Sequence, residues 1–450
     1  MSYQPQYKKK AKKFFAVLLP IFITQIALTS TGFFDTVMSG HVSEQDLAGV
    51  AVGSNLFMPF FGSFLGVISV LTPVISQHYG AGEKKEIAFV VRQGFYWSLG
   101  LALLFLLLGI LFVPFILDYL RLEPKVAHVA AGYLIAIAFG IVPIFLSGVL
   151  RNLIDAHGYT RLTMMVTLLT VPVNVAANYV FMYGALGVPA FGGIGAGIGS
   201  AIAFVLNFLC NILVVSCIEP FRSYHVFRGL PHPHPAEWKK ALSLGIPIGS
   251  TMFCEMSIFS AVGLFMTIYG TTVVAAHQAA MSFTTLIYMI PLSASMALTI
   301  LVGFEIGAGR SEDAAAFIRL GRLLTFLFEG SLALLLVQFR DVIARLYTSS
   351  PDVQELLVVF LAFAVFLQLA DSIDAPLQGA LRGYKDVHVT FVLAVVSYWV
   401  IGLPVGWALA AFTQLGPYGY WCGLILGIAV GAVFLSLRLH TIQKRFAETL

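Results

Sequence analysis

The chain of 450 residues is 59% hydrophobic and only 11% charged, with a mean hydropathy of +0.89 and a formal net charge of +4. A soluble globular domain carries about 25% charged residues, so this composition excludes a soluble fold and indicates an integral membrane protein. The four cysteines lack the spacing of a zinc site or a disulfide framework, and no nucleophile–base set is apparent. We therefore predict a protein that is not an enzyme, with no cofactor and no nucleic-acid partner.

The amino-terminal segment contains five lysines between residues 8 and 13, followed by an apolar run that is too long for a cleaved signal peptide. Eleven further apolar runs of membrane-spanning length follow it. The sequence therefore predicts an all-α integral membrane protein with twelve transmembrane helices. The predicted spans are 14–38, 46–77, 88–117, 126–149, 160–184, 193–218, 241–268, 273–304, 315–338, 354–378, 387–411 and 417–440.

The two halves of the chain repeat one another. Residues 72–94 align with 299–321 at an offset of 227, matching Gly80-Ala81-Gly82 with Gly307-Ala308-Gly309. A second match, Gly158-Tyr159 with Gly383-Tyr384, has an offset of 225. Two copies of a six-helix unit have the same topology, so the pseudo-twofold axis between them is expected along the membrane normal. We predict an amino-terminal lobe over 1–218, a cytoplasmic linker over 219–240 and a carboxyl-terminal lobe over 241–450.

Basic residues predict the orientation of the chain. Of the 26 Lys and Arg residues, 22 lie in the amino-terminal segment, in alternate loops and at the carboxyl end, and only four lie on the other face. Loops retained in the cytoplasm carry such an excess, so both termini are expected there. On this count no basic residue lies deep in a helix.

Acidic residues behave differently, because several lie within or near the ends of apolar runs. An unpaired charge in that setting is costly, which directs it toward the protein interior or a water-filled cavity. With no buried base to pair with, such acids must be protonated or neutralised by a cation that comes and goes. The acids concerned are Asp35, Glu255, Glu329, Asp371 and Asp374.

Proline and glycine also occur in these runs. Pro20, fifteen residues before Asp35, permits a bend in the first helix and is a candidate hinge. The glycine string over 192–200 opens an apolar helix and fits a nucleotide-binding loop poorly, so it predicts close helix packing through small residues.

Several motifs are distributed along nearly the whole chain. They are FFDTVMSGHVSEQDLAGVAVGSNLF (33–57), the GAGEKKE and GAGRSED loops, RNLIDAHGYTR (151–161), VPVNVAANYVFMYG (171–184), VAAHQAAMSF (274–283) and GALRGYKD (379–386). Together these motifs resemble those of the multidrug and toxin extrusion (MATE) transporters, especially the bacterial NorM-like branch.

The resemblance implies two six-helix lobes around a central cavity, and export of organic cations in exchange for inward H⁺ or Na⁺. The family's first-helix acid falls on Asp35, with the fifth-helix asparagines on Asn174 and Asn178 beside it. Its carboxyl-lobe acids fall on Glu255 and Asp371, a possible Na⁺ site. Gln278 and Asp374 are expected as supporting polar residues.

One departure weakens a Na⁺ mechanism. Some sodium-coupled members have a tyrosine about one turn before the last acid, whereas this chain has Leu367 and Gln368. Lacking a decisive signal, the sequence leaves H⁺ and Na⁺ open as coupling ions. We expect a monomer in the inner (cytoplasmic) membrane, with the lipid bilayer and organic cations as its partners.

Two hypotheses follow for mechanism. Glu255 and Asp371 face one another and share a cation or proton, and Asp35 acts as the switch of the amino-terminal lobe through Asn174 and Asn178. A lipid-linked oligosaccharide flippase of related architecture is the alternative function, although its pyrophosphate would require cationic side chains in the cavity. A channel or receptor is disfavoured by the internal repeat and by buried acids in both halves.

Overall fold

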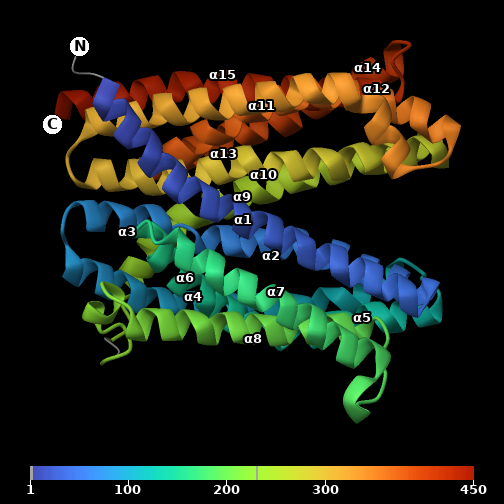
Figure 1. Ribbon diagram of the computed structural model, residues 1–450, viewed down its shortest axis with the longest axis horizontal. Helices are drawn as coiled ribbons and strands as arrows, with labels where there is room; N and C mark the ends of the chain where they lie inside the picture. The colour runs from blue at the N-terminus through green and yellow to red at the C-terminus, as the bar shows by residue number, and fades with distance from the viewer. Residues whose placement is uncertain (1–3, 230–231, 450) are drawn as a thin grey trace. The chain divides into compact units, whose positions relative to one another are not determined.

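The computed structural model describes residues 4–229 and 232–449. Those residues form helices and no strands, which confirms the predicted all-α class. Figure 1 shows long helices joined by short loops. In chain order they are α1 (Gln4–Val42), α2 (Glu44–Ile68), α3 (Leu71–Gly80), α4 (Lys84–Tyr119), α5 (Pro124–Ala138), α6 (Ile141–Ala156), α7 (Thr160–Tyr183), α8 (Ile194–Cys217), α9 (Pro235–Met266), α10 (Thr271–Gly307), α11 (Ser311–Tyr347), α12 (Pro351–Gly383), α13 (Val387–Val395), α14 (Leu403–Phe412) and α15 (Pro417–Thr449), with short helical turns at Ala185–Gly187, Phe221–Tyr224 and Thr267–Tyr269 and a π-helical segment at Val396–Gly402.

Eleven stretches of the described residues are long and apolar enough to cross a membrane singly. One of them joins α2 and α3 over Glu44–Gly80, where the sequence predicts a single span over 46–77. Helices α5 and α6 meet the same criterion only together, and they are bent by 48° at a short break. At that break a Cβ on Gly140 would lie 2.9 Å from Ala201 Cα, so glycine lets α8 approach the bend. Counted as one span, the bent pair gives the predicted twelve.

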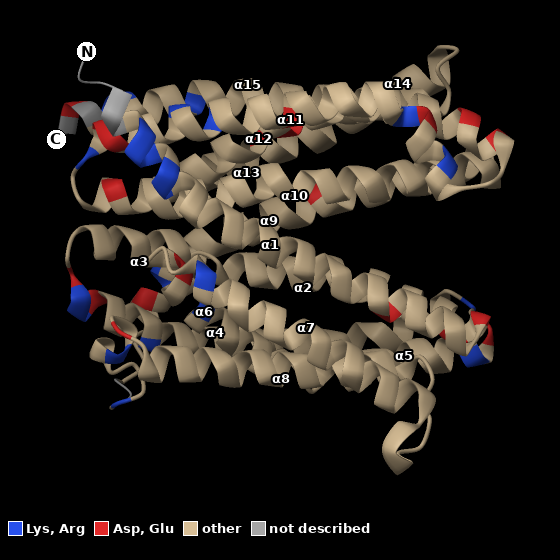
Figure 2. Cartoon of the chain, viewed as in Figure 1, with Lys and Arg blue, Asp and Glu red and all other residues tan. Residues whose placement is uncertain are grey.

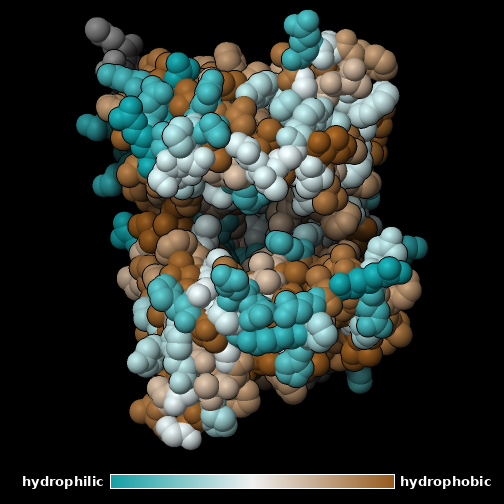
Figure 3. Space-filling model, turned by 90° about the vertical axis from the view of Figure 1, so that its right-hand side faces the viewer, coloured by the Kyte–Doolittle hydropathy of each residue, from teal (hydrophilic) through white to brown (hydrophobic). Residues whose placement is uncertain are grey.

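Charged residues gather at helix ends and in loops, while the helix bodies are mostly uncharged (Figure 2). Hydrophilic residues lie among hydrophobic ones on the face drawn in Figure 3. Helix α4 is the clearest lipid-facing element, since Leu107, Ile110 and Leu111 are 51%, 73% and 59% exposed. An apolar helix surface with its backbone bonded internally is what a lipid environment requires.

The chain divides into two compact units. The amino unit comprises Ile23–Gly249, and the carboxyl unit comprises Met1–Phe22 with Ser250–Leu450. These units differ from the predicted lobes in two places. The start of α1 belongs to the carboxyl unit, and the predicted linker belongs to the amino unit together with the first part of α9.

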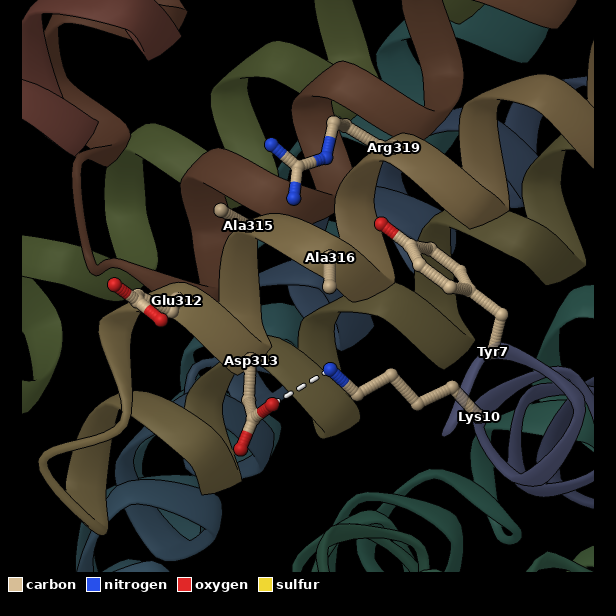
Figure 4. A pocket seen from close by; sticks show the side chains of 7 residues that line it. All are labelled: Tyr7, Lys10, Glu312, Asp313, Ala315, Ala316 and Arg319. Atoms are coloured by element: carbon tan, nitrogen blue, oxygen red, sulfur yellow. Dashed lines mark hydrogen bonds and ion pairs between the residues drawn. The ribbon is translucent and has the colours of Figure 1, made fainter. Parts of the chain in front are cut away.

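The start of α1 joins the carboxyl unit through ion pairs and apolar packing. Lys10 Nζ lies 2.6 Å from Asp313 Oδ1 at the start of α11, and Figure 4 shows the two side chains meeting at the edge of a small pocket. Lys13 Nζ lies 3.4 Å from Glu305 Oε1 near the end of α10. Phe14 is buried in the apolar core built mainly from α10, α11 and α12. Lys10 and Lys13, which belong to the basic amino-terminal segment, therefore anchor the start of α1 to the carboxyl unit.

The predicted linker over 219–240 packs on the amino unit. Phe221 is buried in its short helical turn. Gln93 of α4 holds the following segment, because its Nε2 donates to His232 O at 3.0 Å and its Oε1 accepts from Trp238 Nε1 at 2.8 Å. These contacts explain why the segment groups with the amino unit.

Loop geometry confirms the repeat and corrects one part of its alignment. Helices α3 and α10 both end at the GAG motif, with Gly82 and Gly309 at φ of +76° and +71°. After α6 and α12, the positive φ falls on Gly158 and on Lys385, at +78° and +61°. The offset is therefore 227 here too, and the predicted 225 is wrong. The Gly-Tyr match is a coincidence shifted by two residues, because backbone geometry fixes the equivalence and residue identity does not.

Candidate functional site

In the amino unit, Asp35 of α1 is buried and held by neutral donors. Asn178 Nδ2 of α7 donates to Asp35 Oδ1 at 2.6 Å, and Ser200 Oγ of α8 donates to Oδ2 at 3.5 Å. Asn174 Nδ2 donates in turn to Ser200 Oγ at 3.4 Å. Among the described side chains, none that is basic forms an ion pair with Asp35. The structure thus brings together the acid and both asparagines that the sequence singles out.

The local sequence explains this arrangement. Asn174 and Asn178 are four residues apart, so they share one face of α7, and both are buried. Helix α8 approaches that face closely, since a Cβ on Gly199 would lie 2.0 Å from Asn178 Oδ1. Two other glycines are also confined. A Cβ on Gly195 would lie 2.6 Å from Met182 N, and a Cβ on Gly197 would lie 2.5 Å from Tyr133 O. The predicted packing role of the glycine string is confirmed.

In the carboxyl unit, a glutamine links two acids. Gln378 Nε2 of α12 donates to Glu255 Oε1 of α9 at 2.7 Å and to Asp374 Oδ2 at 2.7 Å. Tyr398 Oη donates to the same Asp374 oxygen at 3.1 Å. Asp374 is only 3% exposed, so its carboxylate is not solvated at a helix end. It belongs to this buried cluster.

Asp371 lies beside this cluster and takes no part in the hydrogen bonds just described. It is 9% exposed and interacts electrostatically with Glu255, Asp374 and Glu329. The predicted neighbours Glu255 and Asp371 are therefore within electrostatic range, but the acid that shares a hydrogen-bond partner with Glu255 is Asp374. That a proton or cation is shared between Glu255 and Asp371 stays a prediction.

Arg382 corrects the expectation that no base lies deep in a helix. The predicted span ends at Gln378, but α12 continues to Gly383, and Arg382 is only 9% exposed. Its Nη2 donates to Gln378 Oε1 at 3.2 Å. The helix stays buried here because α10 packs closely on it: a Cβ on Gly383 would lie 2.8 Å from Val302 Cβ. The side-chain amide of Gln378 thus bonds to the buried Arg382 guanidinium on one side and to the carboxylates of Glu255 and Asp374 on the other.

The other predicted residues lie apart from the two clusters. Gln278 is exposed on α10 and has no hydrogen bond to the described acids. Pro20 is buried inside α1, two residues before the boundary between the units. Glu329 is fully buried on α11. Gln368, which stands near the family's tyrosine position, is buried on α12.

Sequence reasoning missed four polar residues of the clusters. Gln378 and Arg382 follow Asp374 at steps of four, and this spacing on one helix face was a usable signal. Ser200 is the last residue of the glycine string, and Tyr398 lies among apolar residues, so neither is distinguished by its neighbours in sequence. Both are placed beside an acid only by helix packing.

The geometry of the clusters suits protons or a monovalent cation better than a tightly held divalent metal. Within residues 4–229 and 232–449, no three His, Cys, Asp or Glu side chains are grouped to hold a metal ion. Buried acids that are balanced by amides and hydroxyls can change charge when a proton or cation binds. A Na⁺ site at Glu255 and Asp371 stays a prediction.

Comparison with known proteins decides the family. The MatE family model matches the chain twice, over residues 20–180 and 247–408, and the two matches begin 227 residues apart. The chain belongs to the MatE family. It is 47% identical over 97% of its length to a "Probable multidrug resistance protein NorM" of Oceanobacillus iheyensis, covering 98% of that protein. A protein of the same name from Bacillus subtilis is 46% identical, with 98% of both chains covered.

Solved structures of MATE transporters have the same fold as this MatE chain. A Vibrio cholerae MATE transporter in a bent form matches with a TM-score of 0.87 at 18% identity, covering 98% of both chains. A eukaryotic MATE transporter matches with a TM-score of 0.87 at 18% identity, covering 98% of this chain and 99% of the other. The predicted NorM-like resemblance and fold class are confirmed.

Proposed function

We propose that this chain is a secondary antiporter that exports organic cations, drugs among them, in exchange for H⁺ or Na⁺. The curated relatives named as multidrug resistance proteins support efflux. The observation that carries the exchange mechanism concerns the acid of the amino unit. Asp35 is buried, and its hydrogen-bond partners are one amide and one hydroxyl. Such a carboxylate attracts a cation when ionised and loses that attraction when protonated, so an ion gradient can displace the drug.

Apolar side chains supply the rest of what a bulky cation needs. The sequence contains 38 Phe, 17 Tyr and 5 Trp residues, whose ring faces attract cations. A lipid-linked oligosaccharide flippase is less well supported. Arg382 is the buried base of the carboxyl cluster, and its guanidinium already donates to Gln378 beside Glu255 and Asp374, so it is poorly placed to bind a pyrophosphate.

The test is transport by everted membrane vesicles under a single imposed gradient. Ethidium uptake should follow a proton gradient alone or a Na⁺ gradient alone, and should vanish when the effective gradient is dissipated by an ionophore. Vesicles prepared from cells without the protein give the background. Equal ethidium uptake with and without the protein under both gradients would overturn the proposed antiport.

We also propose that the protein is a monomer in the inner membrane. Both termini are cytoplasmic in this proposal, because the excess of basic residues indicates that orientation. Cysteines introduced one at a time at Pro233 and Ser349, after the four native cysteines have been replaced, test this orientation. An impermeant thiol reagent applied to intact cells should label the cysteine at 349 and not that at 233. The reverse pattern contradicts the orientation.

A further inference from the structure

Glu329 is a buried acid that the two clusters do not use. Its side chain lies on α11 and is 0% exposed. Neither carboxyl oxygen has a hydrogen-bond partner among the described residues. An ionised carboxylate in this setting would be an uncompensated charge inside a membrane protein, which is strongly unfavourable. A neutral Glu329, with a proton on one oxygen, avoids this cost.

A second unpartnered polar side chain lies on the neighbouring helix. Helix α11 packs along α12, and Gln368 of α12 is 2% exposed. Both Nε2 and Oε1 of Gln368 lack a hydrogen-bond partner among the described residues. Buried polar groups in proteins are normally bonded, so two orphaned side chains on two packed helices require an explanation.

The repeat shows that packing does not require these polar groups. At the offset of 227, Glu329 corresponds to Ala102 of α4, and Gln368 corresponds to Ile141 of α6. Ala102 and Ile141 are each 0% exposed. The same positions are thus filled by apolar side chains in one copy and by a carboxyl and an amide in the other, which points to a function specific to the carboxyl unit.

The charged neighbour of Glu329 is Asp371. The two acids interact electrostatically. Other titratable or charged side chains on the helices that pack against α11 include Asp374 and Arg382 of α12, His277, Tyr288 and Glu305 of α10, and Tyr420 and Arg438 of α15. Of these, Arg382 is directed to Gln378, and Arg438 is bonded to Asp386. The described bases therefore leave Glu329 unpaired.

We propose that Glu329 is a proton-carrying residue of the carboxyl unit that exchanges its proton with Asp371. The O–H bond of Glu329 breaks as an O–H bond forms on the Asp371 carboxylate, so the pair keeps one negative charge throughout. Asp371, the more exposed of the two acids, is the member that meets the coupling ion or drug. Because no described residue is bonded to the Gln368 side chain, its oxygen is free to accept from a protonated acid and its nitrogen to donate to an ionised one. The role in transport rests on the proposed antiport, but the presence of the proton does not.

The first test is the infrared absorption of protonated carboxyl groups in the purified full-length protein at neutral pH. Glu329→Gln should remove the signal of one protonated carboxyl, whereas Glu312→Gln should leave the spectrum unchanged. Glu312 is the matched control because it lies on the same helix but is exposed at its solvent end (Figure 4). An unchanged spectrum for Glu329→Gln shows that Glu329 is ionised and overturns the proposal.

The second test is ethidium export by proteoliposomes at a series of pH values. Glu329→Gln should lower proton-driven export at least tenfold and change its pH profile, and Glu329→Asp should restore part of the rate. A purely packing role predicts instead that Glu329→Gln and Glu329→Ala, the latter copying Ala102, both keep the wild-type pH profile. That result overturns proton exchange with Asp371, even if the infrared signal is lost. Failure of the wild type to export ethidium would contradict the proposed function and leave the infrared result to decide on the proton.

Discussion

The amino and carboxyl units share a backbone repeat but not a polar interior. At the offset of 227, Asp35 corresponds to Val262 and Glu255 corresponds to Leu28. Asp35 has neutral donors on both carboxyl oxygens, whereas the carboxyl unit gathers several acids around Gln378. Of the buried polar side-chain atoms without a partner among the described residues, three lie in the amino unit and six in the carboxyl unit. A duplicated backbone fixes where helices run, and each copy then acquires its own chemistry.

Neutralising Asp35 should have the largest effect. Asp35→Asn mimics the protonated acid permanently, so export of ethidium should fall to background, a loss of about a hundredfold or more, while the protein stays folded. Resistance of cells and transport by vesicles measure the effect at matched expression. Thr36→Ala, an exposed neighbour on α1, is the control and should export normally. Full resistance with Asp35→Asn would show that coupling resides in the carboxyl unit alone.

A double-mutant cycle tests whether the carboxyl acids act as one site. Glu255→Gln and Asp371→Asn should each reduce coupled export by about tenfold or more, and the double variant should lose little beyond the larger single loss, because one site is removed in each case. The readout is the initial rate of ethidium export under a fixed gradient. If the two losses add fully in free energy, the acids work independently.

The contact between α10 and α12, beside the group of Glu255, Asp374 and Gln378, can be tested by changing Gly379. A Cβ there would lie 2.1 Å from Ser295 O, so Gly379→Ala should destabilise the protein by about 3 kcal/mol, seen as a lower unfolding temperature in detergent. Its counterpart in the amino unit is Asn152, which accepts from Thr72 through its side chain, whereas Gly379 accepts from the matching threonine through its backbone carbonyl.

The matched control is Gly330→Ala on α11, where an added Cβ meets no atom within 4 Å. This change should alter stability by no more than about 1 kcal/mol, and in the stabilising direction, because alanine favours a helix. Equal stability of Gly379→Ala and Gly330→Ala would mean that α10 and α12 do not pack closely at Gly379.

The smallest expected effect concerns His157, between α6 and α7, whose counterpart at the offset of 227 is Tyr384. Burial lowers the pKa of His157 to about 4, and its Nε2 lies 2.7 Å from Tyr224 Oη. Since the unfolded chain takes up a proton near the ordinary pKa of 6.5, stability should fall as the pH drops from 6.5 toward 4. Between pH 7 and pH 5 this loss should reach about 2 kcal/mol.

Thermal unfolding of the wild type and His157→Asn across this pH range checks the effect. The variant should show a shallower decline in unfolding temperature on acidification, although it is less stable than the wild type at pH 7. Parallel declines would assign the acid sensitivity to other groups.

Much of the fold could be predicted because its signals are local or periodic. Apolar runs identify the spans, since a membrane selects for length and hydropathy, and the GAG loops place the repeat at 227 because a positive φ favours glycine. The grouping of Asp35 with Asn174 and Asn178 was predicted from the family resemblance. The bend between α5 and α6 could not be predicted, since it depends on the close packing of α8 against Gly140, a contact between helices far apart in the sequence.

Hydropathy, charge and repetition are properties of the chain, so they were enough to predict a helical membrane protein of two repeated halves with acids in both. Tertiary structure alone decided which polar groups meet. It assigned the start of α1 to the carboxyl unit, buried Arg382 beside Gln378 and isolated Glu329 on a packed helix face. The physical reason is that hydrogen bonds and burial depend on side chains from helices far apart in sequence, and only packing brings these together.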